Sequence, residues 1–67
     1  MNSDILKGKW TQIKGEVKSK WGKLTNDELD KIEGDQLKLQ GLIQEKYGIS
    51  KEEAEKKVQE VIDKHSK

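Results

Sequence analysis

Apolar residues in the first third of the chain recur at steps of three and four. They are Leu6, Trp10, Ile13, Val17 and Trp21. Steps of this length place side chains on one face of an amphipathic helix. Gly22 follows the last of these positions, where a left-handed helix cap is best made by a residue without a Cβ atom. The pattern therefore predicts a helix that begins near Leu6 and ends at Gly22.

A short second helix is predicted soon after the first. Thr25 and Glu28 have the spacing of a capping box, in which each side chain bonds to the backbone of the other residue. Leu24 precedes this start, and Leu29 and Ile32 lie on the helix that follows. The two helices and their tight loop make one unit, at about residues 6–33.

The second half of the chain, at about residues 34–65, repeats this order. Leu39, Ile43 and Tyr47 form a second apolar stripe, and Gly48 stands where that stripe ends. Ser50 begins a second capping-box pattern. The apolar residues of the last helix are Ala54, Val58, Val61 and Ile62. Whether the chain breaks or only kinks at the junction between the units is left open.

Six glycines relate the two halves. Gly8, Gly15 and Gly22 are spaced by seven residues, and Gly34, Gly41 and Gly48 repeat that spacing twenty-six residues later. The same shift relates Leu6 to Ile32, Ile13 to Leu39, Val17 to Ile43 and Trp21 to Tyr47. We therefore expect a single all-α domain, residues 1–67, that is a small bundle of two packed helical hairpins. It would contain four short helices in two related helix–loop–helix units.

The expected core combines residues from both units. It consists of Trp10, Ile13, Val17, Trp21, Leu24, Leu29, Ile32, Leu39, Ile43, Tyr47, Val58 and Val61. The structural glycines are expected to be Gly15, Gly22, Gly41 and Gly48. Gly15 and Gly41 lie inside predicted helices, so we interpret them as crossing points where another helix passes close to the backbone. A docking groove at these two glycines is the less favoured interpretation.

Composition limits the classes of function. Charged residues make up 40% of the chain, arginine and cysteine are absent, and the formal net charge is +1. Neither a disulfide nor a cysteine-based zinc site is possible, and no overall field attracts nucleic acid or anionic lipid. The first residues lack the basic and apolar regions of a signal peptide, and no stretch is apolar enough to span a bilayer. We expect a cytoplasmic protein without integral membrane association.

No pattern of catalytic, cofactor-binding or metal-binding residues stands out. His65 is the only histidine, and we expect it to be a helix C-terminal residue favoured by the dipole rather than a ligand. The carboxylates are expected to form a solvated face, and the glycines match neither a dinucleotide nor a phosphate-binding loop. We therefore expect no enzymatic activity and no cofactor.

The basic first helix offers a sharper hypothesis. Its apolar stripe is flanked by Lys7, Lys9, Lys14, Lys18 and Lys20. Residues 1–25 carry a net charge of +4 and residues 26–45 a net charge of −4. Two tryptophans on a basic helix can stack on single-stranded nucleic acid or lie on an anionic membrane. Because Trp10 and Trp21 are on the stripe itself, we favour a role in the core, and we expect the two charged segments to pair with each other.

Trp10-x-x-Ile-Lys-Gly15-x-Val-Lys-x-x-Trp21-Gly-Lys-Leu-Thr25 resembles the CsbD-like family of small bacterial proteins. The stretches Ile32-Glu-Gly34 and Gly41-x-Ile-Gln-Glu-Lys-Tyr-Gly48 are similar to the second half of that family. The resemblance runs from about residue 8 to residue 60. It implies two packed helical hairpins and a cytoplasmic protein of the general stress response, with no catalytic residue or cofactor.

These observations lead to a functional expectation. We expect a non-enzymatic stress-response protein that binds or protects other macromolecules, with a macromolecular partner that is unknown. The alternative is a nucleic-acid-binding module that uses the basic first helix; the acidic middle segment and the lack of arginine disfavour it. A monomer or a weak homodimer is expected, since a second copy could complete a marginal core.

Overall fold

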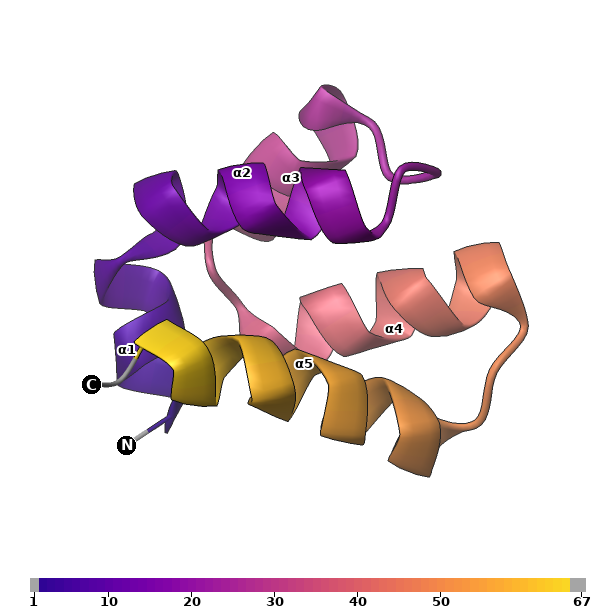
Figure 1. Ribbon diagram of the computed structural model, residues 1–67. Coiled ribbons are helices and arrows are strands. Elements are labelled where there is room, and N and C mark those ends of the chain that lie inside the picture. The colour runs from indigo at the N-terminus through magenta and orange to yellow at the C-terminus, as the bar shows by residue number, and fades with distance from the viewer. Residues whose placement is uncertain (1, 66–67) are drawn as a thin grey trace.

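The computed structural model describes residues 2–65, with the side chains of residues 5–65. These residues form five helices: α1 (Asn2–Gly8), α2 (Trp10–Lys20), α3 (Asn26–Ile32), α4 (Gln36–Tyr47) and α5 (Lys51–His65). In Figure 1, α2 and α3 lie above α4 and α5, and α1 lies beside the C-terminal end of α5. The all-α prediction is confirmed, whereas the relation of the two units by an internal repeat stays a prediction.

The number of helices was predicted wrongly, because the first predicted helix is divided at Lys9. Lys9 has φ −114° and ψ 18°, so it leaves the helical conformation between α1 and α2. Its backbone N–H still donates to the oxygen of Ile5 at 3.0 Å, and its own oxygen accepts from Ile13 at 2.9 Å. Glycine is a poor helix former, and the bend directly after Gly8 lets α1 pack against α5.

The two predicted glycine caps differ in the structure. Gly48 has φ 64°, in the left-handed region, and its N–H donates to the oxygen of Gln44 at 2.8 Å. Gly22 does not have a positive φ. Helix α2 instead ends with Trp21 at φ −120° and ψ 77°, and the N–H of Trp21 donates to the oxygen of Val17 at 2.8 Å. The left-handed cap predicted at Gly22 is therefore absent.

The junction between α3 and α4 is a break rather than a kink. Glu33 and Gly34 have φ values of 53° and 79°. Asp35 then caps α4, since its Oδ1 accepts from the backbone N–H of Lys38 at 3.1 Å. A Cβ atom on Gly34 would lie 2.8 Å from the Cα of Lys7. Only glycine fits both this backbone conformation and this close approach of α1.

Side-chain caps begin the other two helices that follow a loop. The Oγ1 of Thr25 accepts from the N–H of Glu28 at 3.1 Å, and the Glu28 carboxylate accepts from the N–H of Thr25 at 3.0 Å. This is the complete capping box that the sequence predicts. At α5, the Oγ of Ser50 accepts from the N–H of Glu53 at 3.1 Å. Each cap satisfies a backbone donor that the first helical turn leaves free.

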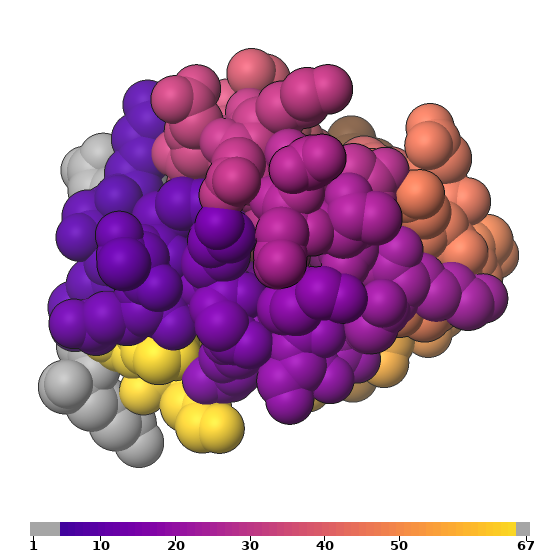
Figure 2. Space-filling view, turned by 90° about the horizontal axis from the view of Figure 1, so that it is seen from above, coloured from indigo at the N-terminus to yellow at the C-terminus, as the bar shows by residue number. Residues whose placement is uncertain are grey.

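All five helices contribute to one core. The buried apolar residues are Leu6, Ile13, Val17, Trp21, Leu24, Leu29, Ile32, Leu39, Ile43, Ala54, Val58, Val61 and Ile62. Trp10 and Tyr47 are partly buried and pack against this core. The hydroxyl of Tyr47 accepts from the backbone N–H of Lys23 at 3.1 Å, which ties the loop after α2 to the end of α4. In Figure 2 the first half of the chain covers the upper face of the molecule.

Gly15 and Gly41 do not mark helix crossings. A Cβ atom on either residue would meet nothing within 4 Å outside its own helix. Helix packing therefore does not explain these two glycines, and we know no structural reason for them. Gly15→Ala and Gly41→Ala are each expected to stabilise the protein by up to about 1 kcal/mol, because alanine is the better helix former. Urea unfolding followed by circular dichroism measures this, and destabilisation by either change would contradict it.

Candidate functional site

Two of the five candidate lysines interact with the ends of helices. The Nζ of Lys9 donates to the backbone oxygen of His65 at 2.6 Å, at the C-terminus of α5. The Nζ of Lys18 donates to the oxygen of Gly22 at 3.3 Å, just beyond α2. A carbonyl oxygen at a helix C-terminus lacks a helical partner and carries partial negative charge, so Lys9 complements the end of α5. Both ammonium groups bind backbone oxygens of their own chain.

Two other candidate lysines pair with carboxylates. Lys14 forms an ion pair with Asp30, which joins α2 to α3. The Nζ of Lys20 lies 3.8 Å from the Oε1 of Glu60 on α5 and 5.2 Å from the centre of the Trp21 ring. Pairs this exposed contribute little to stability. These ion pairs nevertheless place carboxylates beside lysines that were candidates for a nucleic-acid-binding surface.

The two tryptophans differ in exposure. Trp21 is 4% exposed and belongs to the core. Trp10 is partly buried, and its exposed part lies in a shallow depression that Lys7, Lys14, Asp30 and Glu33 also line. A base stacked on Trp10 would meet two carboxylates as well as two ammonium groups. This arrangement is less favourable for a phosphate backbone than a row of unpaired lysines.

Glu16 and His65 form a pair that the sequence analysis did not foresee. The Nε2 of His65 is 2.8 Å from the Oε1 of Glu16, and the Nζ of Lys64 is 3.6 Å from its Oε2. The hydrogen bond with His65 lowers the pKa of the Glu16 carboxyl, and Lys64 lowers it further, while partial burial opposes the change. The pair joins residues forty-nine positions apart, so local spacing carries no signal for it.

The Glu16 pair predicts a pH dependence of folding. Because its pKa is lowered from 4.5 in the folded state, Glu16 adds stability that is present above its ordinary pKa and is lost as the pH falls through the folded value. Glu16→Gln is expected to lower stability near pH 7 and to leave a smaller difference from the wild type near pH 3. Urea unfolding across this range measures the difference. The exposed Glu45→Gln is the control, and a constant difference for Glu16→Gln would contradict the prediction.

Another ion pair joins α3 to α4. The Nζ of Lys46 is 2.9 Å from the Oε2 of Glu28. The hydrogen bond with Glu28 raises the pKa of Lys46. The pKa of Glu28 is lowered first by the backbone N–H of Thr25 and then by Lys46. Glu28 therefore serves both the capping box and the contact between two helices, which is a structural role.

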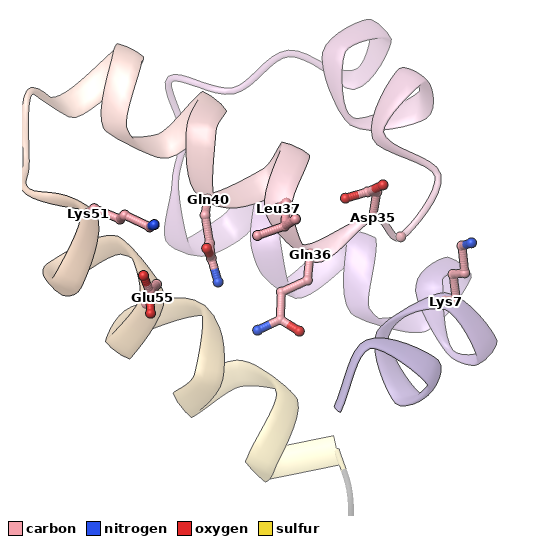
Figure 3. Close-up of a pocket in the computed structure, with 8 residues that line it drawn as sticks. Lys7, Asp35, Gln36, Leu37, Gln40, Lys51 and Glu55 are labelled. Carbon is pink, nitrogen blue, oxygen red and sulfur yellow. The ribbon is translucent and has the colours of Figure 1, made fainter. Parts of the chain in front are cut away.

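A groove with a volume of about 590 Å³ lies between α1, α4 and the first turns of α5. It is lined by Lys7, Gly34, Asp35, Gln36, Leu37, Gln40, Lys51 and Glu55. Figure 3 shows the carboxamides of Gln36 and Gln40 extending from α4 toward α5, where Lys51 and Glu55 lie. Leu37 is 74% exposed, whereas Gln40 is only 6% exposed. The groove thus offers amide, charged and apolar groups side by side.

This groove was not predicted, although the sequence contains a signal for it. Gln36 and Gln40 are four residues apart, as are Lys51 and Glu55. Residues at this spacing share one face of a helix. Only Lys7 was a candidate site residue, and it lies at the other side of the groove from Lys51. What could not be foreseen is that α4 and α5 turn these two faces toward the same hollow.

Among the side chains of residues 5–65, no three or more histidine, aspartate or glutamate residues gather where they could hold a metal ion. None of the described helices is long and apolar enough to cross a bilayer.

Residues 4–56 match the family model described as CsbD-like. A UPF0337 protein of Bordetella pertussis is 51% identical over 65 residues, covering 97% of this chain and 98% of its own length. A UPF0337 protein of Pseudomonas aeruginosa is 48% identical over 64 residues, with 96% and 98% covered. One of Pectobacterium atrosepticum is 52% identical over 65 residues, with 97% and 94% covered.

The chain therefore belongs to the CsbD-like family, as its tryptophan and glycine pattern suggests. Its relatives in this comparison are bacterial. No solved structure matches the chain.

Proposed function

We propose that this chain is a non-enzymatic stress-response protein of the bacterial cytoplasm that acts by binding or protecting other macromolecules. Membership of the CsbD-like family supports the biological setting. The proposed mode of action is supported by the open groove between α1, α4 and α5, whose lining combines amide, charged and apolar side chains. An exposed leucine beside amide and charged side chains can contact both apolar and polar groups of a partner.

The stress-response part of this proposal is tested by measuring how much of the protein cells make. The abundance of the protein is measured by quantitative mass spectrometry in cells with and without osmotic, heat or starvation stress. A severalfold rise under at least one stress is expected. An unchanged level under all three would refute the stress-response assignment and leave the binding activity to be judged separately.

The binding half is tested with the purified protein. Light scattering follows the heat aggregation of an unrelated enzyme, with and without an excess of this chain. Delayed or reduced aggregation is expected, and lysozyme at the same concentration controls for a nonspecific effect of added protein. Equal aggregation with this chain and with lysozyme would refute protection.

Nucleic-acid binding is the second candidate, because the exposed part of Trp10 lies beside Lys7 and Lys14. The carboxylates of Asp30 and Glu33 in the same depression count against it. A gel-shift assay with single-stranded DNA and RNA at low salt tests it. Binding should weaken steeply as salt is added, and the absence of any shift would eliminate this candidate.

For the assembly state, we propose a monomer or a weak homodimer. The charged exposed surface and the exposure of Leu37 as a large apolar residue support at most a weak association. Sedimentation equilibrium over a hundredfold concentration range tests this, and a tight dimer at micromolar concentration would contradict it.

A further inference from the structure

Gln40 is a buried polar residue at the floor of the groove. It is 6% exposed, and the other buried side chains of the described residues are apolar. Its carboxamide forms no hydrogen bond with the residues that the structure describes. Every fully enclosed side-chain nitrogen or oxygen of these residues has a partner, so the amide of Gln40 must open to the groove. Figure 3 shows it extending from α4 toward that space.

A carboxamide in this position selects a particular kind of ligand group. It presents one acceptor oxygen and an NH₂ donor close together. A peptide group presents a donor and an acceptor in return. In the free protein only water in the groove can meet this donor and this acceptor. A ligand that supplies both bonds can replace that water without leaving the amide unpaired.

The rest of the groove agrees with a peptide. Two ammonium groups, Lys7 and Lys51, are balanced by two carboxylates, Asp35 and Glu55, which does not favour a strongly charged ligand. Leu37 exposes 74% of its surface at the same place, and it can cover a large apolar side chain of the ligand. The groove is lined by residues of three helices, α1, α4 and α5. It can therefore hold a stretch of polypeptide rather than a single ion.

We propose that this groove binds an extended peptide segment of another protein, with Gln40 pairing to a peptide group and Leu37 covering a neighbouring apolar side chain. This inference rests on the proposed function, since it assigns the surface through which other proteins would be bound. Gln36 lies one helical turn before Gln40 and offers a second carboxamide to the next part of the segment. Lys51 and Glu55 place one positive and one negative charge beside the bound segment.

The experiment is a titration of the ¹⁵N-labelled protein with the blocked tripeptide N-acetyl-glycyl-leucyl-glycinamide, followed by two-dimensional NMR. Saturable shifts are expected for the side-chain NH₂ of Gln40 and for backbone amides around residues 34–40 and 51–55. Blocked triglycine should bind more weakly, because it lacks the apolar side chain. Free leucine should also bind more weakly, because it lacks a peptide group. Equal shifts with all three probes, or none at Gln40, would overturn the proposal.

Two variants test the residues. Gln40→Met keeps the length of the side chain but removes its hydrogen bonds, and the affinity for the tripeptide should fall about fivefold. Gln44→Met, on the same helix and outside the groove lining, is the matched control and should bind as the wild type does. Leu37→Ala changes an exposed residue, so it leaves the fold intact and should also weaken binding. Unchanged affinity in both groove variants would overturn the proposal.

The aggregation assay separates this inference from the proposed function. If the wild type and both groove variants protect the enzyme equally, protection stands and the groove is not the site. If the wild type binds the tripeptide through Gln40 but fails to protect, the groove assignment stands and protection is refuted. Loss of protection in Gln40→Met and Leu37→Ala, with protection kept in Gln44→Met, is the expected result.

Discussion

Replacing Gly34 by alanine is expected to destabilise the protein by about 2–5 kcal/mol. The new Cβ atom would lie 2.8 Å from the Cα of Lys7 and 3.2 Å from the oxygen of Leu6. Both neighbours are backbone atoms of α1, so a change of side-chain rotamer cannot relieve the contact. The φ of 79° adds strain that a residue with a Cβ atom does not tolerate well. Urea unfolding followed by circular dichroism measures the loss.

Gly48→Ala is the matched control for this prediction. Gly48 also has a positive φ, at 64°, but a Cβ atom there would meet nothing within 4 Å. Only the backbone strain of about 1–2 kcal/mol is then expected. A small domain has only a few kcal/mol of stability to lose, so Gly34→Ala should be largely unfolded under conditions where Gly48→Ala remains folded. Equal stability of the two variants would contradict the close approach of α1.

Leu39→Ala is expected to cost about 2–5 kcal/mol, because it removes a fully buried side chain and leaves a cavity. Leu39 is 0% exposed, whereas Leu37, two residues earlier on the same helix, is 74% exposed. Leu37→Ala makes the same chemical change and is expected to alter stability by less than about 0.5 kcal/mol. Because leucine and alanine have similar helix propensities, the difference between the variants reports burial alone.

The measurement is urea unfolding of both variants and the wild type, followed by tryptophan fluorescence. Trp21 is buried and sits in the same core as Leu39, so its emission should shift to longer wavelength on unfolding. A loss in Leu37→Ala as large as that in Leu39→Ala would show that α4 presents a different face to the core.

Local patterns predicted much of this fold. The stripe of Ile13, Val17 and Trp21 lies in the core because residues at this spacing share one face of a helix. The capping box at Thr25 forms as its spacing requires. The turn of the chain at Lys9 was missed because apolar residues before and after it keep the same helical period, which hides the break. Asp35 was not predicted as a helix cap because the residue three positions later is Lys38, so no capping box marks this start.

Contacts between distant residues account for most of what the sequence could not reveal. The role of Gly34 depends on the backbone of α1, which lies twenty-seven residues earlier. The pair of Glu16 with His65 and the groove around Gln40 depend on how α5 is placed against α2 and α4. No periodic pattern encodes such placements. The glycines at 15 and 41 show the converse, since a regular spacing suggested a packing role that the surroundings do not support.

The contact between α1 and α5 has a consequence for the order of folding. Helix α1 packs against α5, and Lys9, which directly follows α1, donates a hydrogen bond to His65, fifty-six positions away. Helices α4 and α5, in contrast, are neighbours along the chain and pack closely. Closing a short loop costs less chain entropy than closing a long one. Helices α4 and α5 can thus pair early, and α1 docks only when nearly the whole chain is in place. Its docking completes a core to which every helix contributes, so folding should be a single cooperative transition in which α1 is the last helix to be secured.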